Sequence, residues 1–331
     1  MSSPLTDSVP ASPIRGRRLL EIIHQPLLGP LAALVLAIIV FGSITDNFLS
    51  TANLSLLLQQ SVVIGILAVG QTLIILTGGI DLSIGAVAIL GTLVMAKIGA
   101  VQGPWIGLAA AVVVCVLAGL INGTLVAVLN LPPFIVTLGT FTIFFAATQL
   151  YAGSQTYAAV EGVQTVLGES FKIGTFTLTY GVLMMFAVYL LVWYMLKQTA
   201  TGQHIYAVGG NPDAAKLVGI NTRKTLFYVY GLAGLIAAVA AWAALGRIPV
   251  ADPNAFQQAN LETITAVVIG GTSLFGGRGS IFGTLFGMLI VSVLRSGLTA
   301  AGVDALYQNI ATGILVIAAV ALDTLARRRS S

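Results

Sequence analysis

The chain has 331 residues, of which 57% are hydrophobic and only 8% are charged, with a mean hydropathy of +0.99 and a net charge of +4. Soluble domains carry about 25% charged residues, so this composition excludes a water-soluble globular protein. Most of the chain is therefore expected to face lipid or other buried helices. The single cysteine, Cys115, excludes a disulfide within the chain.

The apolar runs are the main structural signal. A membrane-spanning helix needs about 20 mostly apolar residues, and the runs are continuous, which favours helices over a barrel. We therefore expect an all-α, polytopic membrane protein with about ten transmembrane helices. The expected spans are 27–46, 54–77, 82–101, 105–129, 132–153, 178–197, 225–246, 260–276, 280–300 and 305–325.

The distribution of Lys and Arg predicts the orientation. Basic residues flank the first and last spans and occur in the largest internal polar loop, and such residues concentrate on the cytoplasmic side. An even number of spans places all three regions on that side. The expected organisation is a cytoplasmic basic N-terminal segment (1–26), a transmembrane domain (27–325) with a cytoplasmic loop (198–224), and a cytoplasmic basic tail (326–331).

The stretch TGGIDLSIG, residues 77–85, interrupts an apolar region. Glycine weakens a helix by about 1 kcal/mol relative to alanine, so Gly78 and Gly79 predict a helix stop. Asp81 can then cap the next helix by accepting hydrogen bonds from N–H groups near Ser83 and Ile84. Two interpretations remain open: a tight capped turn, or a broken element that lines a pathway or docks a partner.

A second glycine-rich break follows the pair Gly270 and Gly271. Gly279, Gly283 and Gly287 recur every four residues, which predicts one stripe on a helix for close helix packing. Similar breaks in the two parts of the chain suggest two halves of about five spans each, inverted relative to one another.

Polar residues inside the expected spans are candidates for a solute pathway. Asn53, Gln60 and Gln71 are separated by 7 and 11 residues, which places them near one face of a helix. Uncharged amides suit a neutral polyhydroxylated solute, because they both donate and accept hydrogen bonds. The alternative is hydrogen bonding between helices. The further candidates are Asn122, Thr137 and Asn309.

Several chemistries have no signal in the sequence. It contains no nucleotide-binding loop and no clustered His or Cys, so we expect no metal site, no cofactor and no enzymatic activity. Only Arg295 is charged well inside an expected span, near enough to the end for its side chain to reach the interface. Any energy source is therefore expected to lie in another subunit.

The loop 198–224 carries a short helix signature. Asn211 is suited to cap it, Pro212 to occupy its first turn, and Gly219 to end it. Asp213 and Lys216 match the helix dipole. Two turns are too few for a stable isolated helix, so it must pack on the membrane domain or on a partner.

Five stretches carry a resemblance to a known family: GGIDLSIGAV, FIVTLGT, AVGGNPDAAKLVGIN, VVIGGTSLFGGRGSIFGTLFG and ALDTLARRR. The chain resembles the permease subunits of ribose-type ABC importers, the inner-membrane components of binding-protein-dependent carbohydrate uptake systems. The resemblance implies a homodimer in a bacterial inner membrane, a cytoplasmic ABC ATPase that uses the ATP, and a periplasmic sugar-binding protein. It also implies that the 198–224 loop contacts the ATPase through Gly210, Asn211, Asp213, Ala215, Lys216 and Gly219.

The function expected from the sequence is ATP-driven import of a monosaccharide delivered by the binding protein. The alternatives are a branched-chain amino acid permease of the same superfamily and an ion-coupled secondary transporter. The family has no short sugar-contact motif, so the identity of the sugar stays open, as does a heterodimer with a related permease.

Overall fold

The computed structural model describes residues 27–330, without the side chains of 322, 323 and 325–330. The predicted basic segment 1–26 lies outside the described residues, and so do the side chains of the predicted tail 326–331.

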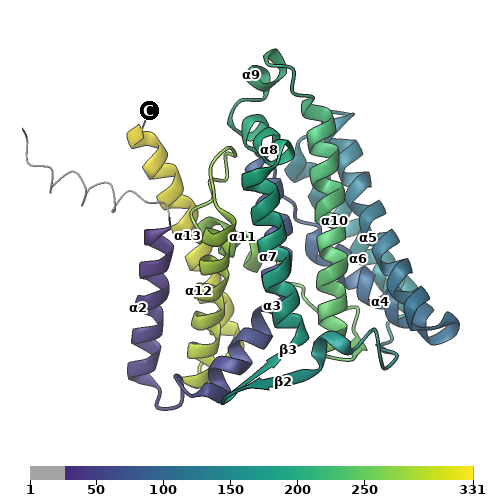
Figure 1. The fold of residues 1–331 in the computed structure, drawn as a ribbon, viewed down its shortest axis with the longest axis vertical. Helices are drawn as coiled ribbons and strands as arrows, with labels where there is room; N and C mark the ends of the chain where they lie inside the picture. Colours follow the sequence, from purple (N-terminus) through teal and green to yellow (C-terminus); the bar gives the residue numbers. More distant parts are fainter. Residues whose placement is uncertain (1–26, 331) are drawn as a thin grey trace, which may run out of the picture.

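The described chain is a bundle of apolar helices (Figure 1), which confirms the helical class. Seven helices are long and apolar enough to cross a membrane. They are α3 (Thr51–Leu76), α4 (Ile84–Gln102), α5 (Pro104–Ala127), α6 (Pro133–Ala152), α7 (Tyr180–Gln198), α10 (Thr222–Arg247) and α12 (Ile281–Ala300).

Three further expected spans coincide with shorter apolar helices. α2 (Leu28–Ile44) has 17 residues and α11 (Ala259–Ile269) has 11, while the apolar part of α13 (Ala305–Ser330) ends at Ala321. The expected span 260–276 is thus cut short at Ile269, because Gly270 and Gly271 end the helix there.

Short elements mark the two ends of the bundle (Figure 1). At one end, called here the α9 end, lie α8 (Ala200–Gly210) and α9 (Pro212–Leu217). The opposite hairpin end carries the antiparallel strands β2 (Ser170–Ile173) and β3 (Phe176–Thr179). A 3₁₀ turn, η1 (Val166–Gly168), precedes the hairpin, and β1 (Tyr157–Ala158) pairs with β4 (Val250–Ala251). The sequence analysis predicted none of these strands.

Helix α10 lies at the centre and packs on α3, α4 and α5. Its buried positions are rich in alanine, and small residues let helix backbones approach closely in lipid. At the crossing with α5, a Cβ on Gly119 would overlap the carbonyl oxygen of Tyr230, and one on Gly234 would overlap that of Cys115. Neither glycine leaves room for a side chain.

The packing of α11 on α12 confirms part of the predicted glycine stripe. Gly283 and Gly287 of α12 lie directly against the backbone of Gly270 and Ala266. Gly279 was wrongly included in this stripe, because α12 begins only at Ile281. A Cβ on Gly279 would instead meet Thr272, within the break itself.

Candidate functional site

The first break, residues 77–83, joins α3 to α4 and turns at Gly78, whose φ is +81°. Asp81 is buried, and its Oδ1 accepts hydrogen bonds from the Ser83 backbone N–H (2.6 Å) and hydroxyl (2.7 Å). The predicted hydrogen bond to the Ser83 N–H is therefore present, but the N-cap of α4 is Ser83 and not Asp81, and no side chain caps the helix. Asp81 instead satisfies the polar groups of Ser83, which need a partner because they are buried.

Three of the predicted pathway residues bind this break. Gln71, Asn122 and Thr137 have no exposed surface. In the orientation that satisfies both groups, the Gln71 amide donates to Asp81 O (3.0 Å) and accepts from Asp81 N (3.3 Å). Asn122 Nδ2 donates to Ser83 Oγ (2.8 Å), and Thr137 Oγ1 donates to Ile80 O (3.0 Å). All three therefore hold the break in place, and none of them belongs to the lining of the cavities described below.

The second break, residues 270–280, joins α11 to α12 and touches the first. Gly271, Gly276 and Gly277 all have positive φ, which suits glycine. The Gly277 N–H donates to Leu76 O at the end of α3 (2.9 Å). A Cβ on Gly276 would lie against the backbone of Gly78. The two breaks therefore form one connected region.

Helices α8 and α9, called here the arm, lie at one end of the bundle (Figure 1), and the end of α8 contacts both the end of α3 and the second break. A Cβ on Gly209 of α8 would overlap the carbonyl oxygen of Leu76, and one on Gly277 would meet Gly210. We call Gly78, Gly209, Gly276 and Gly277 the glycine junction. The junction brings the arm into backbone contact with the end of α3 and with the loop before α12.

A second contact joins the arm to the second break. Tyr206 Oη donates to Gly279 O (3.1 Å), and burial raises the pKa of Tyr206, so the hydroxyl keeps its proton and remains a donor. A cavity of about 550 Å³ lies beside this contact, with Lys197, Gln203 and Arg278 in its lining. This space leaves room for α8 to shift relative to the break.

The local structure predicted for α9 is confirmed. Asn211 Oδ1 accepts from the backbone N–H of Asp213 (3.1 Å) and Ala214 (3.0 Å), and Pro212 occupies the first turn. Gly219, with φ +84°, follows the helix end. Asp213 and Lys216 form an exposed ion pair at 2.9 Å.

The C-terminal end of α9 exposes two apolar side chains. Leu217 and Val218 are 89% and 76% exposed at the far end of the arm, whereas Ala215 is buried. Exposed apolar side chains at the tip of a polar segment favour contact with another protein.

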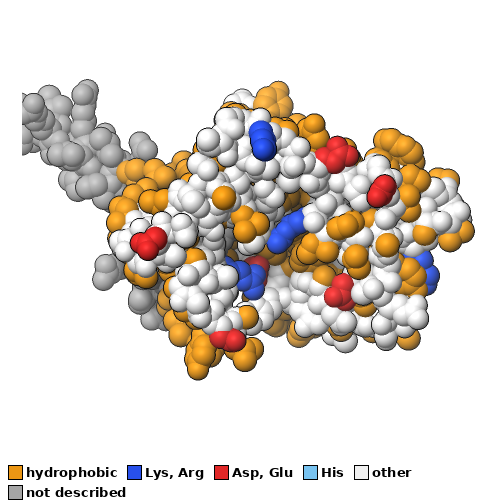
Figure 2. All heavy atoms as spheres, turned by 90° about the horizontal axis from the view of Figure 1, so that it is seen from below, with side chains coloured by type: hydrophobic (Ala, Val, Ile, Leu, Met, Phe, Trp, Pro, Cys, Tyr) orange, Lys and Arg blue, Asp and Glu red, His pale blue; other side chains and the backbone are white. Residues whose placement is uncertain are grey.

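A charged cavity lies at the hairpin end and was missed by the sequence analysis. It has a volume of about 350 Å³ and is called here the hairpin-end cavity. Figure 2 shows that basic side chains gather in and beside a recess near the middle of this face. The residues that line it come from α3, α10, α11, α12 and α13: Leu57, Gln60, Ile64, Arg247, Glu262, Val291, Ser292, Arg295, Thr299 and Gln308.

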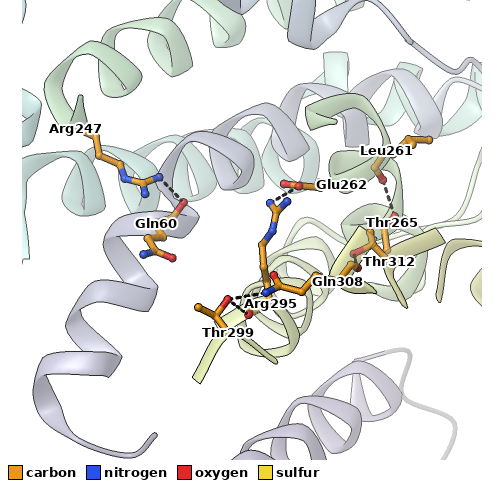
Figure 3. Close-up of polar contacts among 9 residues, drawn as sticks. All are labelled: Gln60, Arg247, Leu261, Glu262, Thr265, Arg295, Thr299, Gln308 and Thr312. Carbon is orange, nitrogen blue, oxygen red and sulfur yellow. Dashed lines mark hydrogen bonds and ion pairs between the residues drawn. The ribbon is translucent and has the colours of Figure 1, made fainter. Parts of the chain in front are cut away.

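An ion pair between α11 and α12 dominates this cavity (Figure 3). Arg295 Nη1 donates to Glu262 Oε1, and Glu262 is only 6% exposed. The Arg295 side chain is 47% exposed while its guanidinium binds this buried carboxylate, so its expected reach to the membrane interface stays a prediction. The sequence analysis did not single out Glu262, because it is the third residue of the expected span 260–276. An acidic residue so close to the end of a span is typical of the adjoining loop.

The other predicted pathway residues lie at this same end. Gln60 lines the cavity, and its carbonyl oxygen accepts from Arg247 Nη1 (3.4 Å, Figure 3). Asn309 lines a smaller neighbouring cavity of about 260 Å³, which Glu262 also borders. Asn53 lies in neither lining, and its Nδ2 donates to Phe48 O (2.8 Å) at the start of α3.

Comparison with known proteins covers almost the whole chain. Residues 53–320 match the family described as "Branched-chain amino acid transport system / permease component". The chain is 45% identical to the fructose import permease protein FrcC of Rhizobium meliloti, over 94% of this chain and 89% of that protein.

Other relatives have related names. The ribose import permease protein RbsC of Bacillus subtilis is 37% identical over 89% of this chain and 92% of its own length. The galactose/methyl galactoside import permease protein MglC of Salmonella typhimurium is 36% identical over 88% and 91%. No solved structure matches the chain.

The role of the buried side chains at the first break can be tested at Thr137. Thr137→Val leaves the carbonyl oxygen of Ile80 without its donor, and an unsatisfied buried group costs about 1–3 kcal/mol. We expect a lower midpoint of thermal unfolding in detergent. Thr142→Val on the same helix is the matched control, since that exposed hydroxyl bonds only to Leu138 O. Equal shifts for the two variants would contradict the assignment.

Proposed function

The chain belongs to the family of branched-chain amino acid transport system permease components, and on this premise we propose that it is the membrane-spanning permease subunit of an ATP-driven monosaccharide importer. Full-length similarity to fructose, ribose and galactose import permeases carries this proposal. Although the family description names branched-chain amino acids, these relatives are sugar permeases, so the amino acid alternative is not favoured.

The two ends of the bundle suit different partners. The α9 end faces the cytoplasm of a bacterium, with both termini on that side, and the exposed tip of the arm contacts an ABC ATPase. The hairpin end faces the periplasm and receives the sugar-binding protein. Two copies of the permease together form the pathway from the hairpin end to the α9 end. The chain itself catalyses no reaction and needs no cofactor, because the partner hydrolyses the ATP.

The glycine junction provides the mechanism of coupling. Movement of the arm displaces the end of α3 through Leu76 and the loop before α12 through Gly277. The same helices line the hairpin-end cavity, through Gln60 and Arg295. A shift at the α9 end is therefore carried by packed helices to the opposite end, where it changes access to the cavity.

Reconstitution tests the proposed function directly. The permease with its ATPase and binding protein, in proteoliposomes, is expected to accumulate D-fructose, D-ribose or D-galactose only when ATP is present on the ATPase side. The permease alone should accumulate none of them. Uphill uptake by the permease alone would support an ion-coupled carrier, and accumulation of leucine in place of sugar would support the amino acid alternative.

The tip of the arm gives a second test. Leu217→Asp places a charge where we expect an apolar contact, and loss of one buried leucine costs about 1.5–3 kcal/mol, so ATPase retention on the purified permease should fall at least about tenfold. Leu217→Met, which stays apolar, is the control.

The ion pair on α9 is tested in proteoliposomes that contain the complete complex. Asp213→Ala with Lys216→Ala should leave stability unchanged, since exposed pairs contribute about 0–1 kcal/mol. The double variant should nevertheless reduce sugar uptake per ATP hydrolysed. Wild-type coupling in it would remove this pair from the ATPase contact.

Two adjacent glycines test the junction. Gly209→Ala forces a methyl group into the backbone of Leu76, whereas a Cβ on Gly210 meets open space. Overpacking costs about 1–3 kcal/mol, and about 1.4 kcal/mol changes a two-state balance tenfold. We expect Gly209→Ala to lose uptake while still binding the ATPase, and Gly210→Ala to transport normally. Equal uptake by both would show that the junction does not carry the movement.

A further inference from the structure

We propose that the hairpin-end cavity is a sugar-binding subsite of the pathway, in which the carboxylate of Glu262 and the guanidinium of Arg295 bind sugar hydroxyls. This inference rests on the proposed function and adds the residues that select the solute. It replaces the predicted pathway residues Gln71, Asn122 and Thr137, whose side chains each form a hydrogen bond to the first break.

The size of the cavity suits a single sugar ring. Its volume of about 350 Å³ lies near the lower limit of small-molecule sites, which run from about 300 to 1,000 Å³. The walls alternate in character: Leu57, Ile64 and Val291 are apolar, while the remaining lining residues are polar or charged. An apolar wall with a few convergent polar groups is typical of small-molecule sites.

The polar groups of the cavity match the hydrogen-bonding needs of a polyol. Each sugar hydroxyl donates one hydrogen bond and accepts up to two, so it needs both kinds of partner. Glu262 only accepts, Arg247 and Arg295 only donate, and the amide of Gln60 does both. Charge-assisted hydrogen bonds are stronger than neutral ones, so a carboxylate and a guanidinium can replace much of the water lost by the sugar.

The state of Glu262 also favours a ligand. Glu262 Oε1 accepts from Arg295, and the Glu262 side chain also borders the cavity. A carboxylate that is largely removed from water is costly, because its desolvation is only partly offset by one ion pair. A sugar hydroxyl in the cavity that donates to the second oxygen, Oε2, would add to this compensation.

The position of the ion pair connects binding to movement. Glu262 on α11 borders both the hairpin-end cavity and the smaller cavity that contains Asn309. Along the chain, Glu262 precedes the second break and Arg295 follows it. Gly277 of this break contacts the end of α3. A sugar that inserts between the two side chains would weaken the contact of α11 with α12 and open the way from one cavity to the other.

The test uses the complete complex in proteoliposomes, with D-fructose, D-ribose and D-galactose as separate substrates. The variants are Glu262→Gln, the charge swap Glu262→Arg with Arg295→Glu, and Lys172→Gln as a control on the exposed hairpin. We expect Glu262→Gln to slow uptake of the best substrate about tenfold, equivalent to about 1.4 kcal/mol, and to change the ratio of rates among the three sugars. The control should match the wild type.

The charge swap separates binding from structure. It keeps an ion pair between α11 and α12 but reverses the positions of donor and acceptor, so we expect it to remain folded and not to transport. Restored uptake in the swap, or an unchanged ratio of sugar rates in Glu262→Gln, would overturn the subsite. Absence of sugar uptake by the wild-type complex would instead overturn the proposed function, and the subsite with it.

A chemical measurement does not depend on transport. Gln60→Cys, in a Cys115→Ala background, places a thiol in the cavity, and Lys172→Cys places one outside it. We expect the transported sugar, at millimolar concentration, to slow reaction of a membrane-impermeant thiol reagent at position 60 but not at position 172. No protection at 60, or protection there by leucine in place of sugar, would overturn the proposal.

Discussion

Every backbone polar group inside a bilayer must find a hydrogen-bond partner within the protein. This requirement is hardest to meet at the two helix breaks, because helix ends leave N–H and C=O groups without partners in the same helix. Asp81 binds the N–H and hydroxyl of Ser83, the residue before α4, while the side chains of Gln71, Asn122 and Thr137 also bind this turn. The exposed end of α3 is satisfied by the second break, through Gly277 N–H. Because each break supplies part of what the other lacks, neither can move alone.

This mutual dependence explains why the arm packs where it does. Glycine at positions 78, 209, 276 and 277 lets α8, the end of α3 and the loop before α12 contact one another through their backbones. Because no flexible side chain lies between these segments, a displacement of one also displaces the others. The beginning of α3 and the end of α12 reach the hairpin end, where the charged cavity lies. One packed region thus connects the arm at the α9 end to the charged cavity at the hairpin end of the bundle.

Features encoded by neighbouring residues could be predicted, and features that depend on distant contacts could not. The helix from Pro212 to Leu217 follows from its own cap and stop signals, and the contact of Asp81 with Ser83 spans two residues, although Ser83 and not Asp81 is the N-cap of α4. Gln71, Asn122 and Thr137 were recognised as unusual, but their partners at the first break were not apparent from helical periodicity. Glu262 and Arg295 are separated by 33 positions and a glycine-rich turn, so their pairing was invisible in the sequence. Gly279 was misplaced because glycine spacing alone cannot show where α12 begins.

The apolar tip of the arm has a consequence for the cell. Leu217 and Val218 leave an apolar surface exposed to water on a newly made subunit that lacks the proposed partner. An orphan copy would be prone to aggregate or to be degraded, whereas an assembled one hides the surface. The abundance of this chain would then follow that of the protein it docks on, and balanced production of the two would need no dedicated regulator.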